Sequence, residues 1–258
     1  MVATVKPLIV IVGPTASGKS DLAMMLAKRF NGEIICADSQ TIYRGMDIGT
    51  AKPTKTDQAL IPHHLLDIRN PDESYSVAQF QRDAQEAIAD INTRGKLPIM
   101  VGGSGLYIDS VIYNYSFISD GQRDDVNPRH LAKDVGLKDK ELRDDTLIIG
   151  IQRNPEELEA RIVERIDRMV EAGLIDEVKN LVAKYGRDAV GLSNIRYQIF
   201  AEYLAGLISL DEAMQKFARN DMLLSKKQKT WFKRNKSIHW MNNREDAVAI
   251  TTTFLNNY

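Results

Sequence analysis

The sequence is poor in cysteine and has no long hydrophobic run. Cys36 is the only cysteine among 258 residues, which excludes an internal disulfide framework and fits the reducing cytoplasm. It lies in the apolar run Ile34–Ala37, so we expect it to be buried rather than reactive. No apolar run approaches the ~20 residues that span a bilayer, and residues 1–12 lead straight into an apolar segment. We therefore expect a cytoplasmic protein without a signal peptide that does not enter the membrane.

Acidic and basic residues are nearly balanced in number. The net charge is −1, so the total charge argues neither for nor against a nucleic-acid partner. Its distribution is more informative, because the segment Ser225–Ser237 carries six basic residues and no acidic one around Trp231 and Phe232. We call this segment the basic stripe. It is typical of a surface for a polyanion, and equally of a solvated helix face with a hydrophobic anchor.

The chain does have the composition of a folded globular protein, 43% hydrophobic and 27% charged. Apolar strand patterns alternate with amphipathic helix patterns in its first half, which predicts an α/β fold with a parallel sheet flanked by helices. We expect helices at Asp21–Phe30 and Ser76–Thr93. The expected strands are Leu8–Val12, Glu33–Ala37, His64–Ile68, Leu97–Val101 and Thr146–Ile151.

Three parts are expected along the chain. Residues 1–115 form the α/β core. Residues 116–145 mix acids and bases with helix breakers, which predicts a short helical insertion on the surface. Residues 146–258 supply the last core strand and a helical C-terminal region, in which Ser209 and Glu212 form a capping box that opens a helix running through Trp231.

The stretch GPTASGKS matches the phosphate-binding pattern G-x-x-x-x-G-K-[ST], between an apolar strand and an amphipathic helix. This context predicts a P-loop NTPase-like sheet. The backbone N–H groups of such a loop point at an anion, the lysine adds a charge, and the final hydroxyl, of Ser20, reaches Mg²⁺. The predicted phosphate-binding residues are Gly13, Pro14, Thr15, Ala16, Ser17, Gly18, Lys19 and Ser20.

Ligands collect at the carboxyl ends of strands in open α/β sheets, so this loop, Asp38–Gln40 and Gly102–Gly105 are expected to meet in one crevice. Two chemistries are open at this point. A nucleotide hydrolase or kinase needs a carboxylate at the end of a further apolar strand, and Asp67 is only a weak substitute. Alternatively, the loop binds a diphosphate that leaves, and Asp38 acts as a base on the nucleophile.

Several stretches together resemble the tRNA dimethylallyltransferase (tRNA isopentenyltransferase) family. The run Ala37–Pro53, ADSQTIYRGMDIGTAKP, is the most specific of them. The resemblance covers most of the chain outside residues 116–145. Its other elements are Gly13–Ser20, Pro62–Ile68, Tyr75–Phe80, Val101–Tyr107, the Arg161–Arg165 pair, Gly173–Val178 and Gln228–Lys233.

The resemblance implies transfer of a dimethylallyl group from dimethylallyl diphosphate to the exocyclic amine of the adenosine 3′-adjacent to the anticodon in tRNA, with Mg²⁺ as cofactor. The implied protein is a monomer that binds the anticodon stem-loop. By this resemblance Asp38 is the general base, and Ser104 takes the place of a catalytic hydroxyl residue. The implied tRNA-binding residues are Asp38, Ser39, Gln40, Thr41, Ser104, one of Arg123 and Arg129, and Lys226, Lys227, Lys229 and Lys233.

The chain departs from the family pattern in three places. Its insertion is short, Met222 and Lys227 stand where the family has arginines, and Asn194-Ile-Arg-Tyr197 replaces the usual Ile-Gly-Tyr-Lys-Glu. We expect an active enzyme in which Arg161, Arg165, Arg196 or Arg219 compensates. Three alternatives remain open: transfer to free adenylate, a small-molecule kinase, and a degenerate tRNA-binding paralogue with little activity.

Overall fold

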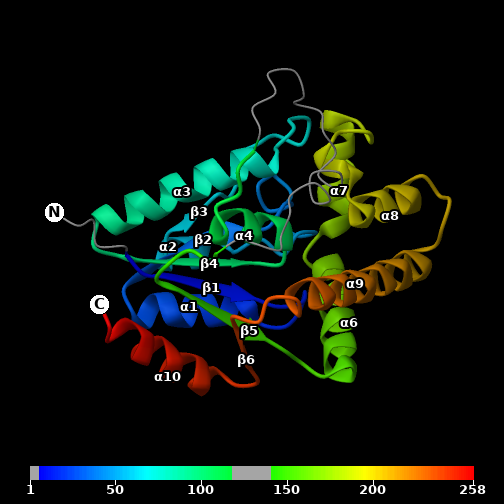
Figure 1. Cartoon of the computed structure of the whole chain (residues 1–258). Coiled ribbons are helices and arrows are strands. Elements are labelled where there is room, and N and C mark those ends of the chain that lie inside the picture. The colour runs from blue at the N-terminus through cyan, green and yellow to red at the C-terminus, as the bar shows by residue number, and fades with distance from the viewer. Residues whose placement is uncertain (1–5, 118–140) are drawn as a thin grey trace.

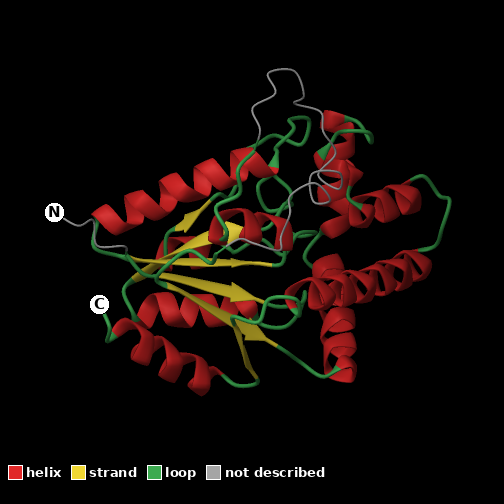
Figure 2. Cartoon of the chain, viewed as in Figure 1, coloured by secondary structure: helices red, strands yellow, loops and turns green. Residues whose placement is uncertain are grey.

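The computed structural model describes residues 6–117 and 141–258. In this part of the chain one sheet has six strands, all parallel, in the order β3-β2-β4-β1-β5-β6 (Figure 2). This confirms the expected P-loop-like parallel sheet flanked by helices. The strands are β1 (Leu8–Val12), β2 (Gly32–Ala37), β3 (His63–His64), β4 (Leu97–Gly102), β5 (Thr146–Ile151) and β6 (Ile238–Met241).

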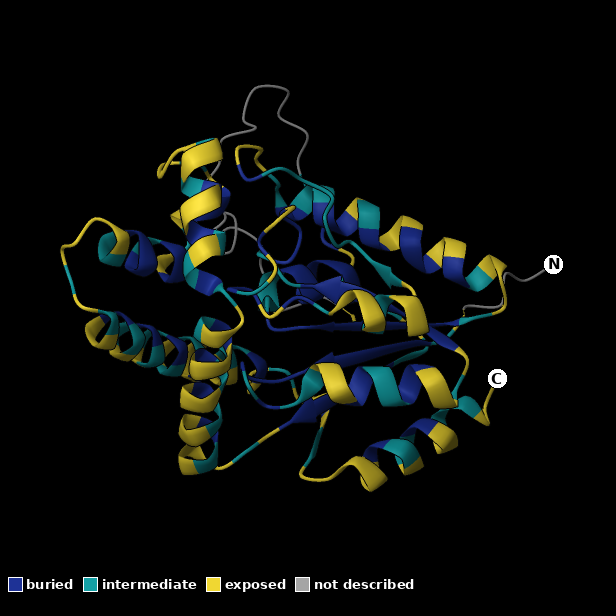
Figure 3. Cartoon of the chain, turned by 180° about the vertical axis from the view of Figure 1, so that it is seen from behind, coloured by how far each residue is buried: buried dark blue, intermediate teal, exposed yellow. Residues whose placement is uncertain are grey.

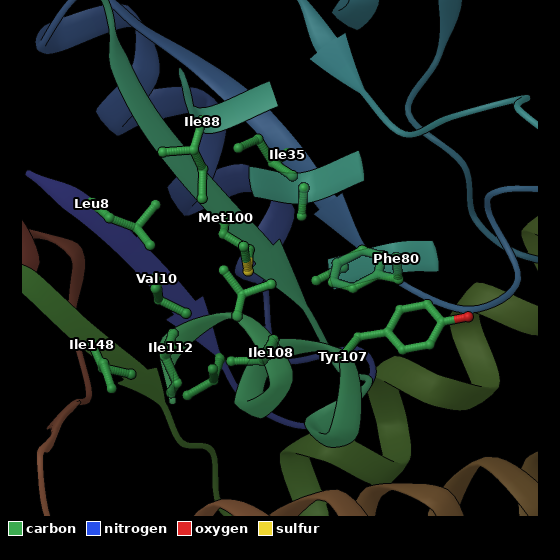
Figure 4. Close-up of a cluster of buried hydrophobic side chains, with 14 of the residues drawn as sticks. Leu8, Val10, Ile35, Phe80, Ile88, Met100, Tyr107, Ile108, Ile112 and Ile148 are labelled. Atoms are coloured by element: carbon green, nitrogen blue, oxygen red, sulfur yellow. The ribbon is translucent and has the colours of Figure 1, made fainter. Parts of the chain in front are cut away.

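Helices cover both faces of the sheet (Figure 1). On one face lie α3 (Val77–Thr93) and α4 (Gly105–Ile112), packed on the strands through the apolar cluster shown in Figure 4. On the other face lie α1 (Lys19–Arg29) and α10 (Arg244–Leu255), whose apolar residues form a second cluster with the strands. The central strands are therefore buried on both faces, which explains why they read as continuous apolar runs.

A third apolar cluster lies beyond the carboxyl ends of the strands, where four helices stand beside the sheet (Figure 1). Figure 3 shows that these helices are buried on their inner faces and exposed outside. They hold Ile42, Tyr43 and Met46, so the segment after β2 is packed into the helical layer. The four helices are α6 (Pro155–Glu171), α7 (Leu174–Tyr185), α8 (Ile195–Leu204) and α9 (Leu210–Phe232). The other helices of the described residues are α2 (Lys55–Leu60) and the short 3₁₀ helix Gly191–Ser193.

Two strand predictions need correction. The strand expected at His64–Ile68 is only His63–His64, because Leu65 and Asp67 adopt left-handed backbone angles (φ 64° and 55°) that end the extended conformation. The expectation that Thr146–Ile151 is the last core strand is wrong, since β6 pairs with β5 in parallel. The other predicted strands are confirmed within one residue.

The helices that begin at a predicted capping residue are confirmed. Ser209 accepts the N–H of Glu212, whose carboxylate accepts the N–H of Ser209, and α9 runs through Trp231 as expected. Ser76 caps α3 in the same way with Gln79. Most of the expected insertion, residues 118–140, lies outside the described residues. Among the described helices, none combines the length and apolar character needed to cross a bilayer.

One carboxylate fastens the segment after β2 to the helical layer. Glu177 on α7 accepts the backbone N–H groups of Asp47, Ile48 and Gly49 at 2.9, 2.7 and 2.9 Å. It also accepts the hydroxyl of Tyr197 at 2.8 Å, and burial together with this carboxylate raises the pKa of Tyr197. Thr50 and Ala51, the next residues, line the main cavity, so Glu177 fixes one wall of it.

We expect Glu177→Ala to destabilise the fold by about 2–3 kcal/mol, because four donors lose a charged acceptor. Urea unfolding followed by circular dichroism measures this difference. Glu164→Ala is the matched control, since Glu164 is exposed and lies 3.9 Å from its partner Arg168; it should change stability by less than about 0.5 kcal/mol. Equal stability of the two variants would show that the anchor contributes nothing.

Candidate active site

The main cavity, of about 870 Å³, opens at the carboxyl ends of β1, β2 and β4. The loops that follow these strands meet there, as the sequence predicts. Helices α6, α8 and α9 close the other side. The lining carboxylates are Asp21 and Asp38, and the lining cations are Lys19, Arg161, Arg165, Arg168, Arg196 and Lys227. Such an excess of cations suits an anionic ligand.

The GPTASGKS loop has the shape of an anion cradle. Gly13 passes so close to β5 that a Cβ there would lie 2.7 Å from the carbonyl oxygen of Ile151, and Gly18 adopts φ 93° where α1 begins. Within the described residues, the N–H groups of Gly18, Lys19 and Ser20 have no protein acceptor. Free N–H groups at the start of a helix bind phosphate.

Lys19 supplies charge inside this cradle. Its ammonium donates to the carbonyl oxygen of Pro14 at 2.5 Å. Burial lowers the pKa of Lys19 to about 8; Asp38 raises it, and Arg165 and Arg196 lower it further. All four side chains line the same cavity, and an anion bound there favours the protonated form of Lys19.

Asp38 lines the same cavity and is partly exposed. Its Oδ1 accepts the N–H of Gln40 at 2.8 Å, so the residue does shape the turn after β2. Its Oδ2 has no hydrogen-bond partner among the described residues. The turn thus holds the carboxylate in place while one oxygen stays free to accept a proton from a ligand.

Ser104 supports this turn from the neighbouring strand end. Its Oγ accepts the N–H of Ser39 at 3.1 Å, and its own N–H donates to the carbonyl oxygen of Ala37 at 3.3 Å. The hydroxyl hydrogen remains available, and the side chain lines the cavity. Ser104 therefore holds the backbone on both sides of Asp38 and is itself in a position to contact a ligand.

Four buried polar atoms on the cavity lining have no hydrogen-bond partner within the part of the chain that the structure describes. They are Ser17 Oγ, Gln40 Oε1, Thr41 Oγ1 and Arg165 Nε. Buried polar groups are nearly always paired in folded proteins, and each unpaired one costs about 1–3 kcal/mol. Their concentration on one cavity indicates that a polar ligand completes them.

Gln228 is a residue of the site that sequence reasoning missed. Its Oε1 accepts the N–H of Thr15 at 2.8 Å, and its Nε2 donates to the carbonyl oxygen of Gly103 at 3.1 Å. A Cβ at Gly103 would lie 2.3 Å from that nitrogen, so a larger residue there would displace the Gln228 amide. Gln228 thereby ties α9 to two of the three loops. Its place in the run Gln228–Lys233 was visible, but no sequence signal indicated this contact.

The arginines divide between two cavities. Arg161, Arg165 and Arg196 line the main one, and Arg161 also donates to the carbonyl oxygen of Ala16 at 2.9 Å. Arg219 and Met222 instead line a smaller cavity of about 390 Å³ between α6 and α9. Of the four arginines expected to compensate, the structure therefore brings three to the phosphate cradle.

The basic stripe combines anchors with free charges. Phe232 is buried in the core, and the indole N–H of Trp231 donates to Asp109 at 2.8 Å, so both rings hold the end of α9 in place. Burial raises the pKa of Asp109 to about 6, against the effect of that hydrogen bond. The lysines Lys226, Lys227, Lys229 and Lys233 are exposed, and Lys227 lines the main cavity. Arg123 and Arg129 lie outside the described residues.

A resident metal would have few protein ligands. Within residues 6–117 and 141–258, no group of three His, Cys, Asp or Glu side chains is placed to hold one. His63 bonds to the carbonyl oxygen of Ile61, and His64 pairs with Glu33, which agrees with structural roles. Ser20 is exposed on the cavity lining at the start of α1. A Mg²⁺ ion bound there would take most of its oxygens from a phosphate ligand, as is usual for Mg²⁺.

Comparisons with known proteins agree with this geometry. The chain is 40% identical to the tRNA dimethylallyltransferase of Alkaliphilus oremlandii, in an alignment that covers 92% of this chain and 91% of the relative. It is 37% identical to the tRNA dimethylallyltransferase of Anoxybacillus flavithermus, over 93% of this chain and 91% of the relative. The alignments extend over 286 and 285 positions, so both relatives contain residues that this 258-residue chain lacks.

Structure and family comparisons point the same way. The crystal structure of tRNA delta(2)-isopentenylpyrophosphate transferase from Staphylococcus epidermidis matches with a TM-score of 0.83 and 35% identity, over 98% of this chain and 100% of that one. The IPP transferase family model matches residues 41–142 and 125–235. On these findings the chain belongs to the IPP transferase family.

Proposed function

We propose that the protein transfers a dimethylallyl group from dimethylallyl diphosphate to the exocyclic amine of the adenosine 3′-adjacent to the anticodon in tRNA. The observation that carries the proposal is the juxtaposition, in one cavity, of an anion cradle and a carboxylate with a free oxygen. The names of the relatives support the reaction type and the tRNA substrate. A monomer that works where tRNA is found, in the cytoplasm, is part of the proposal.

The donor end of the site stabilises the leaving group. As the bond between the prenyl carbon and the diphosphate oxygen breaks, negative charge grows on the diphosphate. The N–H groups of Gly18, Lys19 and Ser20 and the Lys19 ammonium stabilise this charge by donating hydrogen bonds. Because these donors are already in place, they do not have to reorganise in the transition state, and such preorganised donors are usually the largest contribution to catalysis. Mg²⁺, held by Ser20 and the diphosphate oxygens, would supply further charge compensation.

The acceptor end prepares the nucleophile. The exocyclic amine of adenine is weakly nucleophilic, because its lone pair is delocalised into the ring. Asp38 Oδ2 accepts one amine hydrogen as the new nitrogen–carbon bond forms and takes up that proton, so the amine keeps no positive charge. Ser104 keeps the Asp38 turn in place through Ser39.

The purine edge has candidate partners beside Asp38. Gln40 Oε1 and Thr41 Oγ1 are buried on the cavity lining and have no partner among residues 6–117 and 141–258. A base extruded from a single-stranded loop presents donors and acceptors along its edge. The exposed lysines of the basic stripe then contact the phosphates of the anticodon arm, as the polyanion interpretation suggests.

Incubation of the purified chain with labelled dimethylallyl diphosphate, Mg²⁺ and unmodified tRNA, followed by nucleoside analysis, tests the proposal. We expect label in an N⁶-substituted adenosine. Parallel incubations with an anticodon stem-loop and with AMP identify the acceptor. Transfer to AMP alone would replace the tRNA assignment by an adenylate isopentenyltransferase, and binding of the stem-loop without transfer would identify a degenerate paralogue.

Asp38→Asn should lower kcat by about 10²–10⁴-fold, because an amide cannot take up the amine proton. Pyrophosphate affinity should stay nearly unchanged, since the amide keeps the shape of the turn. Single-turnover transfer and pyrophosphate calorimetry measure the two effects. Asp72→Asn, an exposed residue outside the cavity, is the control. A wild-type rate in Asp38→Asn would remove the general-base role.

Lys19→Met should weaken pyrophosphate binding by about tenfold or more, because the cradle loses its charged donor. Lys28→Met, an exposed change on the same helix, should leave the affinity unaltered. Calorimetry with pyrophosphate and Mg²⁺ compares the two. If both variants bind equally well, the diphosphate does not occupy the GPTASGKS loop.

Replacing Lys226, Lys229 and Lys233 together by Gln should weaken anticodon-arm binding and reduce its salt dependence. Loss of three phosphate contacts lowers the slope of log affinity against log salt by about 2–3. The triple variant of Lys28, Lys179 and Lys184, which are exposed elsewhere, removes the same charge. Filter binding at several salt concentrations measures both slopes. Identical slopes would place the basic stripe outside the RNA interface.

A further inference from the structure

A fully buried carboxylate lies in the middle of α9. Asp221 has an exposed fraction of 0%, and its two oxygens accept hydrogen bonds from different arginines. Oδ1 accepts a hydrogen bond from Nε of Arg196 at 2.8 Å and lies 2.7 Å from its Nη2, and Oδ2 accepts a hydrogen bond from Nη2 of Arg165. Because Arg196 is on α8 and Arg165 on α6, one buried charge joins three helices.

This cluster carries one positive charge more than Asp221 neutralises. The side chains of Arg165 and Arg196 are only 19% and 10% exposed, so solvent compensates little of the excess. Burial and the neighbouring Arg196 lower the pKa of Arg165, although Asp221 and, to a smaller extent, Asp38 oppose them. A purely structural ion pair needs one arginine; here Asp221 neutralises one of two, and the other carboxylate that acts on Arg165 is Asp38, which lines the same cavity.

Both guanidinium groups keep donors that Asp221 does not use. Nε of Arg165 is buried without a partner, and Nη1 of Arg196 has none among the described residues. The ring of Phe217 lies 5.5 Å from Cζ of Arg196 and helps to fix the plane of that group. Both side chains line the main cavity, which Lys19 also lines. Fixed, forked donors in a cationic cavity match the oxygens of a phosphate group.

We propose that Arg196, oriented by Asp221, binds the diphosphate of the prenyl donor together with Arg165. This proposal rests on the proposed function for the identity of the anion. Arg196 contacts the substrate, whereas Asp221 is a positioning residue that acts through the arginines.

The same arrangement accounts for two departures in the sequence. Met222 does not line the main cavity but the smaller one, so the position at which the family pattern has an arginine contributes no charge to the cradle. Arg196 falls at the glycine of the usual Ile-Gly-Tyr and brings a guanidinium into the cavity from another helix. The cavity thereby regains an arginine that its sequence pattern lacks.

Calorimetry of the full chain with pyrophosphate and Mg²⁺ tests the proposal. Arg196→Gln should raise the Kd by about tenfold to a hundredfold, the range for losing a charged hydrogen-bond donor. Arg196→Lys keeps the charge but not the paired N–H donors of the guanidinium, so its Kd should lie between those of wild type and Arg196→Gln. Arg219→Gln, an exposed change on α9 that faces the smaller cavity, should bind as wild type does.

Steady-state kinetics separate substrate binding from a general loss of structure. Arg196→Gln and Asp221→Asn should raise KM for dimethylallyl diphosphate about tenfold or more, while KM for the RNA acceptor stays within about twofold. A structural defect would change both constants. If Arg196→Gln or Asp221→Asn does not fold by circular dichroism, Arg196→Lys decides the question through its pyrophosphate affinity.

Two results would overturn the proposal: a folded Arg196→Gln with wild-type pyrophosphate affinity, or an Arg196→Lys indistinguishable from wild type. Failure of the proposed function gives a different pattern. In that case the wild-type protein binds pyrophosphate but transfers no prenyl group, and Arg196→Gln binds pyrophosphate more weakly. The anion site would then be confirmed and the proposed reaction would be wrong.

Discussion

Parallel pairing of the central strands is the constraint on which the site depends. β4 lies between β1 and β2 and pairs Gly102 with both Val12 and Ala37, so three strands end level with one another. Their loops must then meet at one edge, although they are far apart in the sequence. A glycine at 102 permits this close approach, since a Cβ there would lie 1.9 Å from the carbonyl oxygen of Ala37.

The helical layer converts that edge into a closed, charged cavity. Gln228 fixes α9 against two of the loops, Glu177 fixes the segment after β2, and Asp221 draws α6 and α8 together through their arginines. This cavity lowers the stability of the fold, because cations gather in it and buried polar atoms of its lining are unpaired in the described part of the chain. Such a loss of stability is expected where a ligand completes the structure.

Local patterns in the sequence predicted the parts of this arrangement that neighbouring residues determine. The apolar runs of β1 and β5, the phosphate loop and the Asp38 turn are of this kind. β6 was not predicted, because four residues with one polar histidine give little periodicity. Side-chain partners on different helices were also beyond a local pattern: Arg196 and Asp221 are 25 residues apart and meet only because α8 and α9 pack together.

A crystal structure with a non-hydrolysable thio analogue of dimethylallyl diphosphate, Mg²⁺ and an anticodon stem-loop tests the central claim most directly. The account predicts diphosphate oxygens within hydrogen-bond distance of the N–H groups of Gly18–Ser20, and the adenine amine within about 3 Å of Asp38 Oδ2. A diphosphate bound away from this loop, or an amine that faces another side chain while Asp38 contacts neither substrate, would contradict it.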